Sequence, residues 1–300
     1  MRPNIIYLHS HDTARYVQPY GHAVPTPNLQ RLAEQGVLFR QCFCGGPTCS
    51  PSRAALLTGQ YPHSCGIMGL ENRGFVLQHA ERHICHTLRA AGYATALCGV
   101  QHVVHREDIA TLGYDRVVAL KGHRAEHVAP AAAEFLGGEP KEPFFLSVGF
   151  VETHRQFRAP GPAEDARYCL PPAPLPDTPG ARRDMAAFKA SARILDESMG
   201  AVLDALDASG LAENTLVICT TDHGIAFPGM KCNLTDHGVG VMLIMRGPGG
   251  FAGGRVCDAL VSHVDVFPTL CDLLDVGRPE WLQGKSMMPL IRGEAEEIND

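Results

Sequence analysis

Short apolar runs alternate with longer helical patterns along the chain. The runs are rich in Ile, Val, Leu and Phe with little polar alternation, which is typical of strands buried on both faces of a sheet. They predict strands at Asn4–His9, Ala94–Gly99, Phe144–Phe150, Leu216–Thr220 and Val241–Met245. Strands that alternate with helices indicate an α/β sandwich with a large, mostly parallel central sheet flanked by helices.

Capping residues and glycines mark the helices between these strands. Thr26 and Pro27 begin one helix, and Gly36 ends it. Apolar periodicity predicts three more, at His79–Ala91, Asp184–Ser209 and His263–Leu274. A parallel sheet of this kind binds its ligands beyond the carboxyl ends of the strands, so polar residues at those ends are the candidates for function.

Composition narrows the class of protein. With 300 residues and 45% hydrophobic content, the chain is long enough for one large core. A net charge of −6 argues against nucleic acid as a partner. No apolar run approaches the roughly 20 residues of a membrane span, and Met1–Asn4 leads into the first strand without a signal-peptide pattern. These features predict a cytoplasmic protein with no membrane partner.

The eleven cysteines are scattered and form no Cys-x-x-Cys pair, so a zinc ribbon or a thioredoxin-like motif is unsupported. In a reducing compartment most of them are small buried hydrophobic residues. Cys49 is the exception, because the segment CSPSR at 49–53 follows the pattern of a helix start. Ser50 is the predicted N-cap, Pro51 the first helical residue and Gly59 the stop.

Cys49 is therefore predicted at the positive end of a helix. Such an end binds anions and lowers the pKa of a thiol. Local propensity alone is equally compatible with a helix that happens to follow a cysteine. The longer pattern, CSPSR followed by LLTG at 56–59, resembles the maturation motif of the sulfatase family, in the alkaline phosphatase superfamily.

The resemblance extends from Pro3–Ile6 to Gly284–Ser286, and Cys49–Leu70 is most similar to the sulfamidase branch, which cleaves N-sulfated glucosamine. It implies an alkaline-phosphatase-like sandwich and a sulfuric ester hydrolase that acts on a sulfate ester or sulfamate of a small molecule or saccharide. It also implies that a separate formylglycine-generating enzyme oxidises Cys49 to formylglycine. The hydrated aldehyde has two hydroxyls, one to attack sulfur and one to expel sulfate afterwards.

Two polar pairs follow predicted strands, His11-Asp12 after the first and Asp222-His223 after the fourth. In the family, residues at these positions bind a divalent metal together with the modified cysteine. The implied ligands are His11, Asp12, Asp222, His223 and Cys49. The family metal is commonly calcium, while the histidines make manganese or another transition metal an alternative.

Four further positions match the family's catalytic residues. The resemblance implies that Arg53 neutralises the nucleophile, His102 assists the formylglycine and His154 contacts the sulfate and protonates the leaving group. Lys231 is implied to bind sulfate oxygens as a point charge.

Two departures from the family pattern change the picture. Val100 stands where the family has a lysine, so a cation beside the nucleophile is missing. Such a loss can cost roughly 100- to 1,000-fold in rate unless another group, such as Gln101 or His105, compensates. The second departure is length: we predict a catalytic domain at 1–290 and an acidic tail at 291–300, with the family's C-terminal subdomain absent or truncated.

Three alternatives stay open at this point. The first is a phosphonate monoester or phosphodiester hydrolase, which shares the fold and the formylglycine. The second is a catalytically inactive binding protein, favoured by Val100 and the missing subdomain. The third is an enzyme that uses an unmodified Cys49. The sequence does not choose the substrate, the metal or the oligomeric state.

Overall fold

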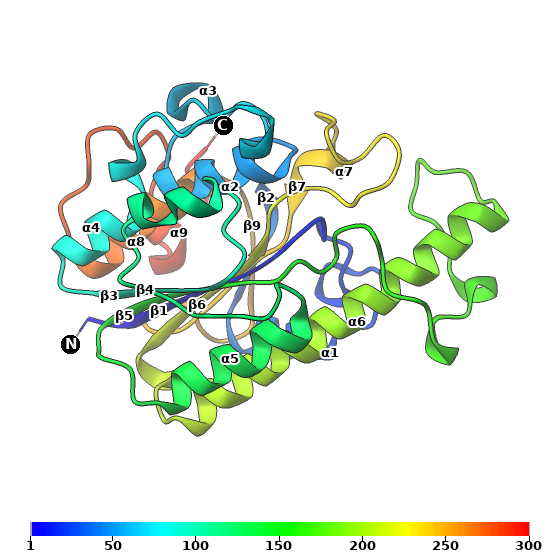
Figure 1. The fold of residues 1–300 in the computed structure, drawn as a ribbon, viewed down its shortest axis with the longest axis horizontal. Helices are drawn as coiled ribbons and strands as arrows, with labels where there is room; N and C mark the ends of the chain where they lie inside the picture. The colour runs from blue at the N-terminus through cyan, green and yellow to red at the C-terminus, as the bar shows by residue number, and fades with distance from the viewer. Residues whose placement is uncertain (1, 300) are drawn as a thin grey trace.

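The computed structural model describes residues 2–299, arranged around one central sheet (Figure 1). In this described part of the chain the strands are β1 (Asn4–Ser10), β2 (Val37–Phe43), β3 (Ala94–Gly99), β4 (Arg116–Val117), β5 (Phe144–Gly149), β6 (Thr215–Thr221), β7 (Gly240–Val241), β8 (Leu243–Arg246) and β9 (Arg255–Ser262). Their order in the sheet is β4-β3-β5-β1-β6-β8-β2-β7, and β9 pairs with β2.

The sheet is mostly parallel, as predicted. The first strand, β1, lies in the middle and pairs in parallel with both β5 and β6. β3 continues the parallel arrangement beyond β5, and β4 beyond β3. β8 reverses direction and is antiparallel to both β6 and β2. The parallel half therefore gathers the carboxyl ends of β1, β3, β5 and β6 at one edge of the sheet.

Helices cover both faces of this sheet (Figure 1). They are α1 (Pro27–Gln35), α2 (Cys49–Thr58), α3 (Pro62–Cys65), α4 (Ile84–Ala90), α5 (Ala125–Gly137), α6 (Pro179–Ala208), α7 (Asp236–Val239), α8 (Val266–Leu274) and α9 (Met288–Arg292). Along β1, Ile6 and Leu8 pack with residues of α1, α5 and α6, while Ile5 and Tyr7 pack with residues of α2, α4 and α8. The side chains of one strand thus join two separate cores, one on each face.

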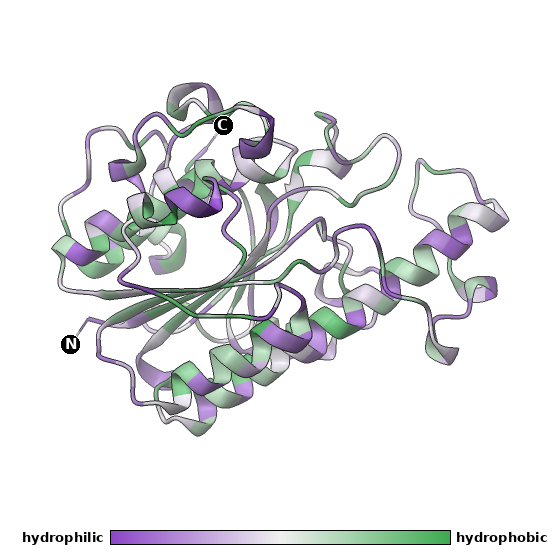
Figure 2. Cartoon of the chain, viewed as in Figure 1, coloured by the Kyte–Doolittle hydropathy of each residue, from purple (hydrophilic) through white to green (hydrophobic). Residues whose placement is uncertain are grey.

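The covering helices carry both apolar and polar residues along their length (Figure 2). This is the amphipathic pattern of helices that rest one side on a sheet. Among the described residues, no helix combines the length and the apolar character needed to cross a membrane.

Most predicted elements are present, with corrections at their ends. The predicted helix His79–Ala91 is wrong in its first half, because a 3₁₀ turn at Ala80–Arg82 precedes α4 and His83 is the N-cap of α4. The last predicted strand is interrupted between β7 and β8. The helix α6 begins at Pro179, before the predicted start, because the Thr178 side chain caps it. β2, β9 and α5 were not predicted.

Candidate active site

The helix α2 begins at Cys49, and Thr48, in an extended conformation, is its N-cap. The prediction of Ser50 as the cap and Pro51 as the first helical residue is therefore wrong, since both already lie inside the helix. The Ser50 hydroxyl instead accepts a hydrogen bond from the backbone N–H of Glu71, at 3.2 Å. Gly59 ends α2 in the left-handed conformation, as predicted. Cys49 thus lies at the positive end of this helix.

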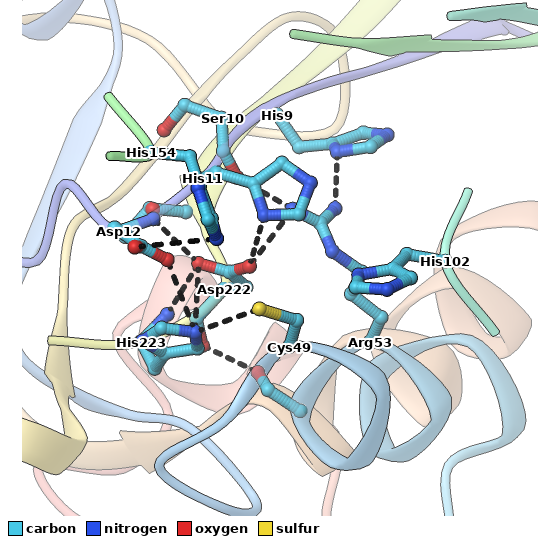
Figure 3. Close-up of polar contacts among 12 residues, drawn as sticks. His9, Ser10, His11, Asp12, Cys49, Arg53, His102, His154, Asp222 and His223 are labelled. Atoms are coloured by element: carbon cyan, nitrogen blue, oxygen red, sulfur yellow. Dashed lines mark hydrogen bonds and ion pairs between the residues drawn. The ribbon is translucent and has the colours of Figure 1, made fainter. Parts of the chain in front are cut away.

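Four of the five predicted metal ligands form one compact group (Figure 3). One nitrogen of His11, one carboxylate oxygen each of Asp12 and Asp222, and the sulfur of Cys49 all lie within 4.8 Å of one another. All four side chains are buried. The backbone N–H of Asp12 donates to Oδ1 of Asp222 at 2.8 Å, which ties the end of β1 to the end of β6.

His223, the fifth predicted ligand, adjoins this group and points one ring nitrogen at it. Its Nδ1 lies 2.9 Å from the carbonyl oxygen of Gly224, so Nδ1 carries the proton of a neutral ring. Nε2 then directs a lone pair toward Asp12 Oδ1, at 3.3 Å, and Cys49 Sγ, at 3.2 Å. A lone pair among carboxylate oxygens is the arrangement that a bound cation satisfies.

His11 gives a second indication that the group fits a metal. Its Nδ1 lies 3.0 Å from Asp222 Oδ2, yet this buried nitrogen has no well-formed hydrogen bond within the described chain. Burial, and then Arg53, hold the pKa of His11 well below its usual range, so the ring is neutral and able to ligate. Two carboxylates, two imidazoles and a sulfur together suit a divalent cation.

Arg53 is almost completely buried behind these ligands. Its Nη2 donates to the carbonyl oxygen of Ser10 at 2.8 Å and to Asp222 Oδ2 at 3.0 Å, and its Nη1 contacts His9 Nδ1 at 2.6 Å. Burial alone would lower the pKa of Arg53, but the nearby Asp222 raises it. Arg53 therefore stays charged and orients Asp222.

Two predicted residues lie at the solvent side of the group. Lys231 Nζ binds both carboxylate oxygens of Asp12, at 3.0 and 2.8 Å, and Asp12 raises the pKa of Lys231 against the effect of burial. His154 Nε2 lies 3.9 Å from Asp12 Oδ2, with 39% of its side chain exposed. Both side chains are therefore reachable by a substrate.

His102 follows β3 in the left-handed conformation, with φ at 55°, which is uncommon for a residue other than glycine. Its ring lies 5.6 Å from the ring of His11, and one of its nitrogens lies within 4.8 Å of both Cys49 Sγ and a nitrogen of His11. Burial and then Arg53 lower the pKa of His102 to about 4. Every side chain predicted for the site is thus at one edge of the sheet.

Comparison with known proteins decides the family. The Sulfatase family model matches residues 3–276. The chain belongs to the sulfatase family. Human N-sulphoglucosamine sulphohydrolase is 32% identical over 91% of this chain and 62% of its own length. An ulvan-active sulfatase of Formosa agariphila is 26% identical, over 96% of this chain and 54% of its own length. The chain thus spans less than two thirds of these curated relatives.

Solved structures confirm the alkaline-phosphatase-like sandwich. A protein in complex with its substrate D-glucosamine-2-N,6-O-disulfate superposes with a TM-score of 0.81 at 21% identity, covering 100% of this chain and 82% of that one. The phosphonate monoester hydrolase of Agrobacterium radiobacter superposes with a TM-score of 0.77 at 23% identity, covering 97% and 77%. At these identities the likeness establishes the fold.

One expectation for this sulfatase-family chain is wrong. The helix terminus was predicted to lower the pKa of the Cys49 thiol, but burial, followed by the charges of Asp222 and Asp12, raises it. The side chain of an unmodified Cys49 is deeply buried between two carboxylates, which disfavour a thiolate. The favourable end of one helix does not offset these two effects.

Neither residue suggested to compensate for Val100 contacts the metal-ligand group within the described chain. The side-chain Oε1 of Gln101 accepts from the backbone N–H groups of Val103 and Val104, which holds its own loop together. His105 Nδ1 instead lies 2.8 Å from Glu71 Oε2.

Three residues near the site were not assigned a role from sequence. His9 accepts from Arg53, and Glu71 contacts His102 as well as His105. His263 lies buried between the hydroxyls of Ser52 and Thr220, and Ser52 donates to the carbonyl oxygen of Asp222. The only sequence signal was that His9 lies in the first strand two residues before His11, and that histidines are numerous.

Proposed function

We propose that this chain hydrolyses a sulfate ester or a sulfamate, carried by a small molecule or a saccharide, with a nucleophile made from Cys49. The position of Cys49 supports this most directly: it begins α2 and lies within 4.8 Å of ligand atoms of His11, Asp12 and Asp222. The similarity to human N-sulphoglucosamine sulphohydrolase supports a sulfated saccharide.

In this proposal His11, Asp12, Asp222 and His223 hold one divalent cation, Ca²⁺ in the first instance and Mn²⁺ as the alternative that the two imidazoles favour. The cation supplies charge stabilisation to the sulfate group. A formylglycine at residue 49, made by a formylglycine-generating enzyme, supplies a hydroxyl nucleophile.

The remaining residues bind, orient and move protons. Lys231 and His154, at the solvent side, bind sulfate oxygens, and His154 donates a proton to the leaving oxygen or nitrogen. His102 accepts a proton from a hydroxyl of residue 49. Arg53 orients Asp222, because its Nη2 donates to Oδ2 of this buried carboxylate at 3.0 Å and supplies the compensating charge.

The test uses protein made together with a formylglycine-generating enzyme. Peptide mass spectrometry around residue 49 should find that sulfur has been replaced by an aldehyde oxygen. The same preparation, loaded with Ca²⁺ or Mn²⁺, is then assayed with 4-nitrophenyl sulfate, N-sulfoglucosamine and a phosphonate monoester, with Cys49→Ala as the matched control.

Turnover of a sulfate ester or sulfamate that Cys49→Ala abolishes is the expected result. A clear preference for the phosphonate would favour the phosphonate hydrolase instead. Metal binding without turnover of any of the three would favour an inactive binding protein. Turnover by a chain with an intact thiol would overturn the formylglycine mechanism.

A further inference from the structure

Glu71 is a buried carboxylate that the proposed reaction does not use. It opens a single 3₁₀ turn, Glu71–Arg73, and is only 9% exposed. Its backbone N–H donates to Ser50 Oγ at 3.2 Å, so this turn is fastened to the residue that follows Cys49 on α2. A buried carboxylate costs free energy unless its oxygens are paired, so the partners of Glu71 indicate what it does.

Both partners are histidines from the loop after β3. Oε2 lies 2.8 Å from His105 Nδ1 without a well-aligned hydrogen bond, and Oε1 lies 3.4 Å from His102 Nε2, so both contacts are ion-pair distances. The three side chains contact one another in the order His105, Glu71, His102. The His105 side chain is 45% exposed, whereas His102 lies beside the metal-ligand group. Glu71 therefore links the helix that carries the nucleophile to the loop that carries His102.

The two nitrogens of His102 have different surroundings. Nε2 faces the Glu71 carboxylate, whereas the buried Nδ1 has no hydrogen-bond partner among the described residues. A neutral imidazole carries one proton, and a carboxylate favours that proton on the nitrogen that faces it. Nδ1 is then left with a free lone pair.

We propose that Glu71 is a positioning residue that holds His102 in the Nε2–H tautomer and orients its ring toward residue 49. This inference rests on the proposed function. When a hydroxyl of residue 49 gives up its proton, its O–H bond breaks and an N–H bond forms at Nδ1 of His102. The Glu71 carboxylate stabilises the resulting imidazolium through Nε2–H, and the proton is later released to water.

A pocket of about 490 Å³ lies beside this line, at the carboxyl ends of β3 and β4. Glu71 and His102 line it together with aliphatic side chains that include Val100, Val104 and Ile109. A substrate group that enters this pocket would meet Glu71 itself. Direct substrate contact is thus the rival role for Glu71, and it would alter KM, whereas positioning of His102 alters kcat.

The first test reads the tautomer without any turnover. Long-range ¹H–¹⁵N NMR on metal-loaded protein labelled with ¹⁵N-histidine reports which ring nitrogen is protonated, and His102→Gln assigns the signals. We expect Nε2–H at His102 in the unaltered chain. In Glu71→Ala this preference should be lost, and in Glu71→Gln it should persist, because the amide oxygen still accepts. An Nδ1–H tautomer in the unaltered chain would overturn the proposal.

The second test is kinetic. Glu71→Ala should lower kcat roughly 10- to 100-fold with KM changed less than about twofold, and Glu71→Gln should retain more of the rate. In a His102→Ala background, Glu71→Ala should have almost no further effect. An equal loss in both backgrounds, or a change confined to KM, would refute the positioning role.

Two controls separate the explanations. Thermal unfolding of each variant shows whether the fold is intact, and peptide mass spectrometry shows whether residue 49 is equally modified. If the unaltered chain turns over no sulfate compound, the proposed function fails, while the NMR result still decides the tautomer.

Discussion

Arg53 Nη2 lies 3.0 Å from Asp222 Oδ2, with 1% and 0% of the two side chains exposed. Arg53 comes from the first turns of α2, and Asp222 directly follows β6. This ion pair therefore joins the helix that carries Cys49 to the edge of the sheet that carries the metal-ligand group. Because both charges are buried, each depends on the other for compensation.

We predict that Arg53→Met lowers the free energy of unfolding by about 3–5 kcal/mol, because it leaves the Asp222 carboxylate buried without its cation. Urea denaturation measures this directly. The matched control is Arg40→Met, since Arg40 pairs with Asp258 at 2.6 Å but both side chains are mostly exposed. The control should cost less than about 1 kcal/mol. Similar losses in the two variants would contradict the structural role of the buried pair.

Metal binding is predicted to depend on Asp12 and, selectively, on His11. After treatment with a chelator, calorimetry should show one divalent ion bound per chain, and Asp12→Asn should weaken its binding at least roughly 100-fold. His11→Ala should weaken Mn²⁺ more than Ca²⁺, because an imidazole is the softer ligand.

The matched control for the metal experiment is Asp258→Asn. It removes an exposed carboxylate whose ion-pair partner is Arg40 and not a residue of the metal-ligand group. It should leave the affinity unchanged. Unchanged affinity for both metals in His11→Ala would show that His11 is not a ligand, and equal weakening would contradict its selectivity for Mn²⁺.

An unmodified Cys49 is predicted to react slowly with iodoacetamide. Cys49 is 2% exposed, and burial with the Asp222 and Asp12 charges raises the pKa of its thiol, so little thiolate forms at neutral pH. Cys232 is exposed and should be alkylated first. Time-resolved peptide mass spectrometry in the presence of a chelator measures both rates in one sample. Fast modification of Cys49 would instead favour an enzyme that uses the thiol itself.

We predict that the buried His83 makes the protein less stable as the pH falls. It is completely buried, its Nδ1 accepts from the backbone N–H of Cys85 at 3.3 Å, and burial lowers its pKa to about 3. The unfolded chain therefore binds more protons than the folded chain between about pH 6.5 and pH 3. The contribution of His83 is fully present above pH 6.5 and is lost as the pH falls through this window.

The free energy of unfolding should fall between pH 7 and pH 5 in both chains. In His83→Gln it should fall by about 2 kcal/mol less than in the unaltered chain. Urea denaturation at each pH gives the slope. An unchanged slope in His83→Gln would show that this ring does not titrate with unfolding.

The strands that position the site could be predicted because they are nearly uniform in character. β1 and β6 are buried along their whole length, so their apolar runs stand out, and each is followed at once by a polar pair. β9 could not be recognised in this way, because its outward positions are polar or exposed and only Ala259 and Val261 are buried. α5 contains Pro130 in its interior, which argues against a helix until its packing on the sheet is known.

The candidate site could be predicted where function follows strand ends, and not where it depends on contacts between distant segments. Asp12 and Asp222 are found from their places after β1 and β6. Nothing local to Glu71 reveals that it meets His102, and nothing in the first strand reveals that His9 accepts from Arg53. The prediction of a lowered pKa for the Cys49 thiol failed for the same reason. Burial and the two nearby carboxylates, which raise this pKa, are properties of the folded chain and leave no local signal in the sequence. The roles of the site residues, the domain boundary at 290 and the cytoplasmic location stay predictions.

The central place of β1 sets an order of events during synthesis. β1 is synthesised first, but its partner strands β5 and β6 end only at Gly149 and Thr221. The sheet beside Cys49 therefore stays incomplete until residue 221 has been synthesised. At the usual rate of translation this delay lasts on the order of 10–30 s. After β6 has joined the sheet, Cys49 is buried and is no longer accessible to another enzyme. A large enzyme that modifies Cys49 would therefore have to reach it before the sheet is complete, so that modification and folding compete for the same chain.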